Sequence, residues 1–147
     1  MTPYLILDYE TIMALTYAAK RGVDVSIIMP HIPDKKYAFA VAKTYYRELL
    51  EAGVKIYEYE PGFVHAKVFV SDHAKAVVGT INLDYRSLFH HFECATLLYE
   101  NSKIADIEQD FQDTLKKCIK ARPSDYKAQP FYMRAMGTIL RMFAPLM

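Results

Sequence analysis

The first half of the chain repeats a helix-then-strand pattern. Apolar side chains recur at helical spacing over residues 10–21, and the run over residues 23–29, rich in β-branched side chains, then predicts a strand. The plan repeats with a helix over residues 34–52, which Asp34 can cap, and an alternating strand over residues 54–59. Strands separated by helices of this length indicate an α/β fold with a parallel sheet.

The middle of the chain is rich in strand patterns. Residues 63–71 and 74–78 are two candidate strands, and the polar pair Asp72-His73 between them predicts a short turn. A third strand is expected over residues 92–99. Together with the first half, these patterns predict a mixed or parallel sheet flanked by helices.

The last third of the chain returns to helical patterns. A helix is expected over residues 102–120, with a serine at its N-cap, acidic residues in its first half and lysines in its last turns. Residues 122–125 include a proline and break this helix, and an amphipathic stretch over residues 131–143 predicts a final helix. We therefore expect a main domain over residues 1–121, followed by a linker with an amphipathic C-terminal helix over residues 122–147.

Length and composition fit one folded domain. The chain has 147 residues, 52% of them hydrophobic, which is enough for one core and excludes a disordered chain. The net charge is +1, which gives no support to bulk electrostatic binding of nucleic acid. Residues 1–100 carry ten basic and twelve acidic side chains, whereas residues 101–147 carry eight and five, so the positive excess is C-terminal. No apolar run reaches the roughly 18 residues of a membrane span. Cys94 and Cys118 fit neither a disulfide framework nor a metal knuckle.

The candidate chemistry lies between His65 and Asn82. Residues two apart on a strand share a face, so His65 and Lys67 project together. The imidazole can attack phosphorus or move a proton, and the ammonium can stabilise negative charge on phosphoryl oxygens. The end of the next strand, Gly79-Thr80, can return Asn82 to the same place, where its amide can donate to a phosphoryl oxygen. Asp72 has the opposite parity and lies at the expected turn, which favours a turn or supporting role.

These residues match a known signature. His65, Lys67 and Asp72, followed by Gly79-Thr80-Ile81-Asn82, resemble the H-x-K-x(4)-D-x(6)-G-[ST]-x-N signature of the phospholipase D superfamily. The flanks are similar to the second half of bacterial cardiolipin synthases, in Thr2-Pro3-Tyr4, in residues 51–59, in Asn82-Leu83-Asp84-Tyr85-Arg86-Ser87 with Phe92-Glu93, and in residues 140–146. The resemblance is close over residues 2–121. It implies a phospholipase D-like α/β fold that forms one lobe of a two-lobed architecture.

The resemblance implies a two-step exchange at phosphorus, with no metal and no other cofactor. One histidine attacks a phosphodiester to form a phosphohistidine, and a second protonates the leaving alcohol and activates the incoming one. His65 would be the nucleophile or the acid/base, Lys67 and Asn82 would bind phosphate, and Glu93 would hydrogen-bond an imidazole and set its tautomer. The candidate catalytic residues are His65, Lys67, Asp72 and Glu93. The supporting residues are Gly79, Thr80, Asp84, Arg86 and Ser87, of which Asp84 and Arg86 are expected to form an ion pair or to position their loop.

The chain carries half of the site that this family needs. Family synthases have two signatures and N-terminal membrane helices, and this chain starts where their second half starts. The other H-x-K spacing, His73-Ala74-Lys75, falls in the expected turn and has Thr80 where an acidic residue is required. The missing half can come from a separate N-terminal half or from a second copy in a twofold dimer.

The resemblance implies phosphatidyl transfer, with cardiolipin made from phosphatidylglycerol at the bacterial cell membrane. Two alternatives stay open: a single-signature phosphodiesterase or nuclease that acts as a homodimer, and an inactive fragment. The near-neutral charge weighs against nucleic acid as a partner. The apolar C-terminal helix, with Arg134 and Arg141, fits equally a lipid interface and packing on the domain or the missing half. His90-His91 is not expected to bind metal, because adjacent strand residues point to opposite faces.

Overall fold

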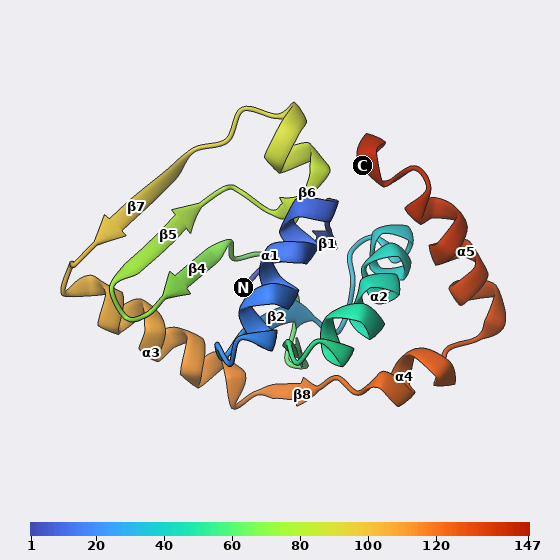
Figure 1. Cartoon of the computed structure of the whole chain (residues 1–147), viewed down its shortest axis with the longest axis horizontal. Coiled ribbons are helices and arrows are strands. Elements are labelled where there is room, and N and C mark those ends of the chain that lie inside the picture. The colour runs from blue at the N-terminus through green and yellow to red at the C-terminus, as the bar shows by residue number, and fades with distance from the viewer.

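The computed structural model describes residues 1–147, apart from the side chains of Tyr126 and Lys127. Helices and strands alternate in the first half, and antiparallel strands follow in the middle (Figure 1). In chain order the elements are β1 (Leu5–Ile6), α1 (Tyr9–Lys20), β2 (Ser26–Pro30), α2 (Lys36–Glu51), β3 (Lys55–Tyr59), β4 (Val68–Ser71), β5 (Lys75–Gly79), β6 (Leu83–Asp84), the π-helical turn η1 (Arg86–His90), β7 (Ala95–Tyr99), α3 (Lys103–Leu115), β8 (Cys118–Lys120), α4 (Pro123–Ala128), α5 (Phe131–Arg141) and the short 3₁₀ helix η2 (Ala144–Leu146).

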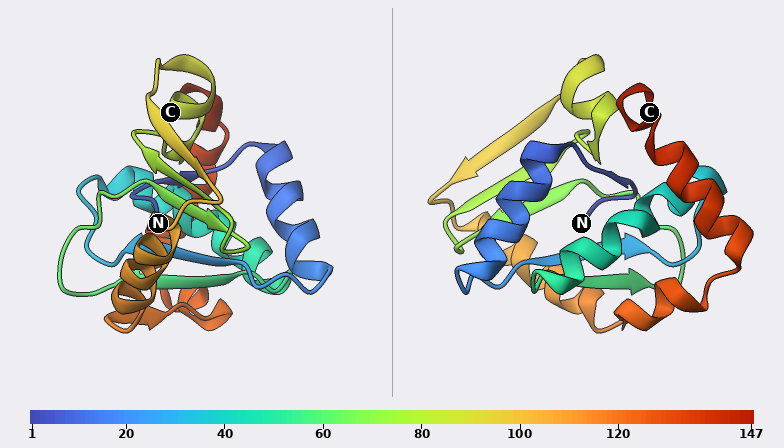
Figure 2. Two further views of the ribbon diagram at one scale, coloured as in Figure 1. Left: turned by 90° about the vertical axis from the view of Figure 1, so that its left-hand side faces the viewer. Right: turned by 45° about the vertical axis from the view of Figure 1, so that its right-hand side comes forward.

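The strands form three small sheets of mixed direction. β2 pairs with β3 in parallel, and β8 lies antiparallel on the other side of β3. β4, β5 and β7 form an antiparallel sheet in that order, and β1 pairs with β6 in parallel. Helix α3 packs against β3, β4 and β5, and α5 packs against α2 at the opposite side of the molecule (Figures 1 and 2). The predicted class, mixed sheets flanked by helices, is confirmed.

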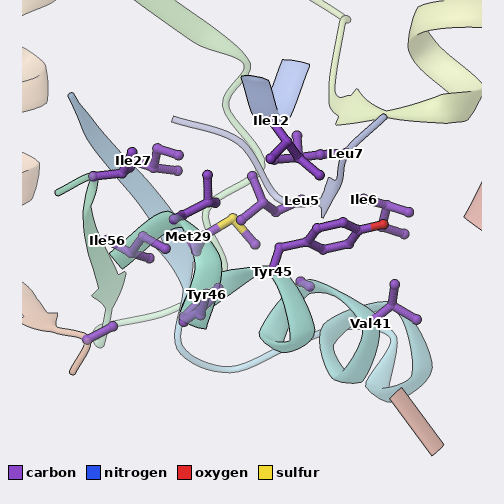
Figure 3. Close-up of a cluster of buried hydrophobic side chains, with 14 of the residues drawn as sticks. Leu5, Ile6, Leu7, Ile12, Ile27, Met29, Val41, Tyr45, Tyr46 and Ile56 are labelled. Atoms are coloured by element: carbon purple, nitrogen blue, oxygen red, sulfur yellow. The ribbon is translucent and has the colours of Figure 1, made fainter. Parts of the chain in front are cut away.

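The main core lies where β1, β2 and β3 meet α1 and α2 (Figure 3). Helix α2 contributes Val41, Tyr45 and Leu49, which are four residues apart and so lie on one stripe of the helix. The strands contribute side chains such as Leu5, Met29 and Ile56, all of them fully buried. Burying a large apolar side chain stabilises the fold by about 1.5–3 kcal/mol. This packing holds α2 across the parallel strands.

A buried ion pair joins α2 to β3. The Lys43 ammonium donates to the Glu58 carboxylate, and both side chains are only 9% exposed. His31 Nδ1 lies 3.0 Å from the second Glu58 oxygen, Oε2. The Lys43 ammonium also lies over the rings of Phe39 and Tyr46, 4.9 and 4.5 Å from their centroids. Aromatic faces favour a cation in this position, so the ion pair is surrounded by compatible groups.

The C-terminal part departs from the sequence prediction in its boundaries. The helix expected over residues 102–120 ends at Leu115, and Cys118–Lys120 is β8. Three residues are too few to show a strand period, and their backbone finds partners only because β3 offers an open edge. The break expected at residues 122–125 is the beginning of α4, with Pro123 as its first residue, where a proline is well tolerated.

Two expected helix caps are also replaced. Asp34 does not cap α2, which begins without a side-chain capping bond, and Asp34 Oδ2 instead accepts a hydrogen bond of 2.6 Å from the Tyr4 hydroxyl. Ser102 occupies the N-cap position of α3, but its side chain makes no capping bond. The Oδ1 atom of Asn101 accepts from the Lys103 amide at 2.9 Å in its place. Side chains of this type bond whichever donor is nearest, which residue type alone does not reveal.

Helix α5 packs one face on α2 and exposes the other. Gly137 is buried against Ala40, and the Arg141 guanidinium lies 4.0 Å from the centroid of the Tyr45 ring. The opposite face exposes Phe131, Tyr132 and Ile139. Packing on the domain is therefore confirmed for one face, while the division of the chain at residue 121 stays a prediction. Among the helices that the structure describes, none has the length and hydropathy needed to span a bilayer.

Replacing Gly137 by alanine is expected to destabilise the protein, although alanine is the better helix former. A Cβ here would overlap the backbone carbonyl of Ala40, so α5 would have to move away from α2. We expect the free energy of unfolding in urea to fall by about 1–3 kcal/mol. Gly62→Ala is the matched control, because a Cβ there meets no atom within 4 Å. Equal stability of the two variants would contradict the packing of α5 described above.

Candidate active site

A small cavity collects the predicted phosphate-binding residues. Its volume is about 370 Å³, and its lining consists of His65, Lys67, Gly79, Thr80 and Asn82. The strand expected from residue 63 begins only at Val68. The ladder nevertheless extends one residue further back, since the Gly79 amide donates to the Lys67 carbonyl at 3.2 Å. The structure therefore brings His65, Lys67 and Asn82 to one place, as their spacing predicts.

Lys67 is a buried cation that lacks a close counterion. Its ammonium donates to the His65 carbonyl at 2.6 Å, and it forms no ion pair with any carboxylate of the described residues. Burial lowers the pKa of Lys67 below its ordinary value, and the more distant charges of Glu93, Asp84 and Asp34 oppose this effect. An anion that entered the cavity would supply the missing counter-charge, which makes Lys67 suited to binding a phosphoryl group.

The His65 side chain stays accessible at the mouth of the cavity. Its ring lies 5.7 Å from the ring of Phe63, centroid to centroid, at an interplanar angle of 30°. Among the described residues none hydrogen-bonds the imidazole, so neither ring nitrogen is occupied by a neighbour. A nucleophile or proton carrier needs this freedom.

Asn82 adds a second polar group that is not satisfied. Its Oδ1 atom is buried and has no hydrogen-bond partner among the described residues. Buried polar atoms without partners are rare in folded proteins and often mark a place where a ligand or water binds. Asn82 also lines the cavity that contains Lys67, and its Nδ2 group is the end of the amide that can donate to a phosphoryl oxygen.

Glu93 bonds a hydroxyl, where an imidazole was expected. The Thr80 hydroxyl donates to Glu93 Oε2, and the Cys94 amide donates back to Thr80 Oγ1 at 3.0 Å. Hydrogen bonds from Thr80 and then Ser87 lower the pKa of Glu93 below its ordinary value. Glu93 therefore orients Thr80 at the cavity wall, and among the described residues no histidine ring hydrogen-bonds it.

Removing the Thr80 hydroxyl is expected to raise the pKa of Glu93. The hydrogen bond stabilises the carboxylate form, so Thr80→Val should move the titration of Glu93 toward that of a free glutamate. An NMR titration of the side-chain carboxyl carbon measures the shift. Ser71→Ala is the control, because that hydroxyl bonds Asp72 at the far end of the hairpin. An unchanged Glu93 pKa in Thr80→Val would contradict the bond.

The glycine of the signature is required by close backbone contact. A Cβ at Gly79 would overlap the carbonyl oxygen of Cys94 on the neighbouring strand. Only glycine lets β5 and β7 approach so closely at the point where Thr80 enters the cavity. This supporting residue therefore acts by shape and carries no chemistry of its own.

The supporting residues after β6 build the turn η1. The buried Asp84 carboxylate accepts from the Ser87 amide at 2.7 Å and so caps the turn. Arg86 is exposed, and its Nη2 atom lies 3.2 Å from Nε2 of His91. The ion pair expected between Asp84 and Arg86 is wrong, because the backbone of the turn competes for the carboxylate. Positioning of the loop, the alternative expectation, fits Asp84.

Asp72 is a turn residue and lies away from the cavity. It and His73 adopt left-handed backbone conformations, with φ of 52° and 55°, and the Ala74 amide closes the turn on the Ser71 carbonyl. Asp72 Oδ2 accepts from the Ser71 hydroxyl at 2.9 Å. The expected turn is therefore confirmed, whereas the place of Asp72 among the catalytic residues stays a prediction. In the described part no group of three or more His, Cys, Asp or Glu is arranged to hold a metal.

One residue near the site, Asp34, was not predicted from the sequence as part of it. Asp34 is close enough to raise the pKa of Lys67, and it is bonded to the Tyr4 hydroxyl. Its position in the sequence could have indicated this, because Asp34 follows β2. Polar residues that follow neighbouring parallel strands meet at one edge of a sheet.

Known proteins resemble this chain in sequence and in fold. Residues 1–115 match the family model described as the phospholipase D-like domain of cardiolipin synthase. The chain belongs to the phospholipase D superfamily. This phospholipase D-like chain is 58% identical over 147 residues to an uncharacterized protein of Streptococcus mutans, and 39% identical over 146 residues to cardiolipin synthase 2 of Bacillus cereus.

The phospholipase D-like chain corresponds to part of these relatives. The two alignments cover 100% and 99% of the chain but 32% and 28% of the relatives, so the chain spans about a third of their length. A solved phospholipase D family member, Nuc from Salmonella typhimurium, has the same fold, with a TM-score of 0.70 and 22% identity. That match covers 83% of this chain and 80% of Nuc.

Proposed function

We propose that this chain supplies one half of the active site of a phosphatidyl-transfer enzyme that makes cardiolipin from phosphatidylglycerol. The single observation that carries the proposal is the cavity in which His65, Lys67 and Asn82 meet. An accessible imidazole beside an uncompensated cation and an amide whose NH₂ group can donate to phosphoryl oxygens suits attack on a phosphodiester. The 39% identity to a cardiolipin synthase supports a phospholipid as the substrate.

The proposed reaction has two steps. A nitrogen of one imidazole attacks phosphorus, the bond to the leaving glycerol oxygen breaks, and the second imidazole gives that oxygen its proton. The free hydroxyl of a phosphatidylglycerol then attacks the phosphohistidine, loses its proton to the second imidazole, and frees the first. His65 takes one of these two roles. Lys67 and Asn82 bind the non-bridging oxygens, whose negative charge is greatest in the transition state.

The second imidazole has to come from outside the cavity described. His65 is the only histidine in the lining of this cavity. The relatives are about three times as long as the chain, which supports a second half as the source. The face of the β4-β5-β7 sheet that carries Lys67 and Gly79 continues into Leu97 and Tyr99, which are 67% and 60% exposed. This open apolar face beside the site supports docking of the missing half.

A twofold dimer of the chain is the second candidate, in which the function is that of a single-signature phosphodiesterase. The likeness to Nuc favours it, because this chain covers 80% of that protein. Two copies of His65 would then complete one site. The net charge of +1 gives nucleic acid little electrostatic attraction, so we rank this candidate second.

One experiment tests both candidate functions by supplying the substrate of each. The protein is incubated with phosphatidylglycerol in mixed micelles and, separately, with single-stranded DNA, while light scattering reports its oligomeric state. Cardiolipin formation, detected by mass spectrometry, supports the proposal. Cleavage of DNA without lipid turnover by a dimer would replace it with the second candidate. No turnover of either substrate, also after addition of the N-terminal half of a relative, would indicate an inactive fragment.

A further inference from the structure

An exposed apolar rim lies beside the candidate active site. It is made by two segments far apart in sequence, the turn η1 with the residues after it and the C-terminal end of the chain. The rim consists of Leu88, Phe89, Phe92, Met142, Phe143 and Leu146, which are 38% to 109% exposed. Figures 1 and 2 show η1 and η2 close together at one end of the molecule.

Hydrogen bonds hold the two segments in one surface. The Arg86 amide donates to the Met147 carbonyl at 3.0 Å, and the Nε2 atom of His90 lies 2.8 Å from the Pro145 carbonyl. Ser87 and Asp84 fix the other side of η1 to the body of the protein. The rim is therefore a prearranged surface, and presenting it to a partner requires no refolding.

The rim is directly connected to the catalytic cavity. η1 follows β6 and Asn82, and the Ser87 hydroxyl contributes to the environment of Glu93. Glu93 in turn holds Thr80 at the cavity wall. A partner seated on the rim would consequently lie next to the mouth where a phosphodiester enters.

The two segments that form the rim carry basic but no acidic side chains. In the sequence, residues 85–92 and 126–147 contain four basic residues and no Asp or Glu, and of the two flanking carboxylates Asp84 is buried and Glu93 is held by Thr80 and Ser87. Arg86 is exposed on η1, beside the exposed imidazoles of His90 and His91. Exposed aromatic and aliphatic side chains in segments with an excess of basic groups suit the interface of an anionic bilayer, where apolar groups enter the acyl region and cations meet headgroup phosphates.

We infer that this rim docks on an anionic phospholipid bilayer and sets the cavity over the headgroup layer. The inference rests on the proposed function for the identity of the substrate, but the docking itself requires no turnover. It assigns to the rim a different partner from the Leu97 and Tyr99 sheet face, which is left for the second half of the site.

Vesicle sedimentation tests the rim directly. The protein is mixed with vesicles of phosphatidylcholine alone or of phosphatidylcholine with phosphatidylglycerol, and the bound fraction is measured. The triple variant Phe89→Ser, Phe92→Ser, Leu146→Ser should lower the partition coefficient on the anionic vesicles by about tenfold or more. The control replaces three other exposed apolar residues, Tyr17→Ser, Val23→Ser and Ile32→Ser, and should change it by less than about twofold.

A charge variant and a solution measurement complete the test. Arg86→Gln should weaken binding to the anionic vesicles and leave binding to neutral vesicles unchanged. Wild-type binding by the rim triple variant would overturn the inference. So would a rim variant that loses only self-association, because the rim would then be a protein interface. Rim-dependent binding without any cardiolipin formation would support the docking surface and count against the proposed function, so the two failures are distinct.

Discussion

His65→Ala is expected to reduce cardiolipin formation by the assembled enzyme by about 10³-fold or more. Whether His65 attacks phosphorus or carries the proton, its loss removes one of the two imidazoles that the reaction needs. The assay follows product from phosphatidylglycerol under conditions in which the wild-type chain, as a dimer or with its second half, turns over. The expected loss lies in kcat, because Lys67 and Asn82 still bind the phosphate.

The chain offers a matched control for this variant. His73 stands in the other H-x-K spacing, His73-Ala74-Lys75, but lies in the exposed turn between β4 and β5 and bonds Glu108. His73→Ala should therefore retain at least about half of the activity, as is usual for surface substitutions away from a site. Similar losses in the two variants, or full activity of His65→Ala, would contradict the assignment. Trapping of phosphohistidine in acid-quenched wild-type protein would show covalent catalysis independently.

Lys43→Met is expected to give the largest loss of stability among the substitutions considered. It removes the cation that faces Glu58 in a site where both side chains are 9% exposed. Breaking a buried ion pair typically costs about 3–5 kcal/mol, because an uncompensated buried charge remains. The free energy of unfolding in urea should fall by that amount at neutral pH. His31 also contacts this carboxylate, and burial together with the nearby Glu58 raises the pKa of Tyr46 above its ordinary value.

Two comparisons separate the pair from general effects of removing a lysine. Lys55→Met breaks the exposed pair with Asp24, whose atoms are 2.8 Å apart, and should leave the free energy of unfolding nearly unchanged. The double variant Lys43→Met, Glu58→Leu should regain most of the lost stability, since no buried charge is then left alone. A Lys43→Met variant as stable as Lys55→Met would show that the buried pair contributes nothing.

The grouping of the candidate site residues could be predicted from local sequence because these residues follow one another on a hairpin. His65 and Lys67 are two apart on an extended segment, and a short turn returns the chain to Gly79 and Asn82. Alternation along a strand and pairing across a hairpin are short-range rules, so spacing alone places these side chains together. Asp72 belongs to the signature, but along an extended strand its side chain would fall on the face opposite to His65 and Lys67. This alternation already indicated the turn in which the structure places it.

The partners of charged side chains could not be predicted in this way. Glu93 bonds Thr80, Asp84 caps Ser87, and Asp34 bonds Tyr4, and in each case residue type permitted several partners. Which partner a carboxylate finds depends on the packing of elements that are distant in sequence. The same holds for β8, whose three residues form a strand only because the edge of β3 is open to them.

The sequence by itself determined the α/β class, the hairpin that carries the signature, and the residues that line the cavity. These follow from periodicity and spacing, which act over a few residues. Only the tertiary structure decided that Lys67 is buried without a counterion, that Lys43 and Glu58 form a buried pair, and that η1 and the C-terminal end form one exposed surface. Burial and the meeting of distant segments depend on how all elements pack, and no local pattern contains that information.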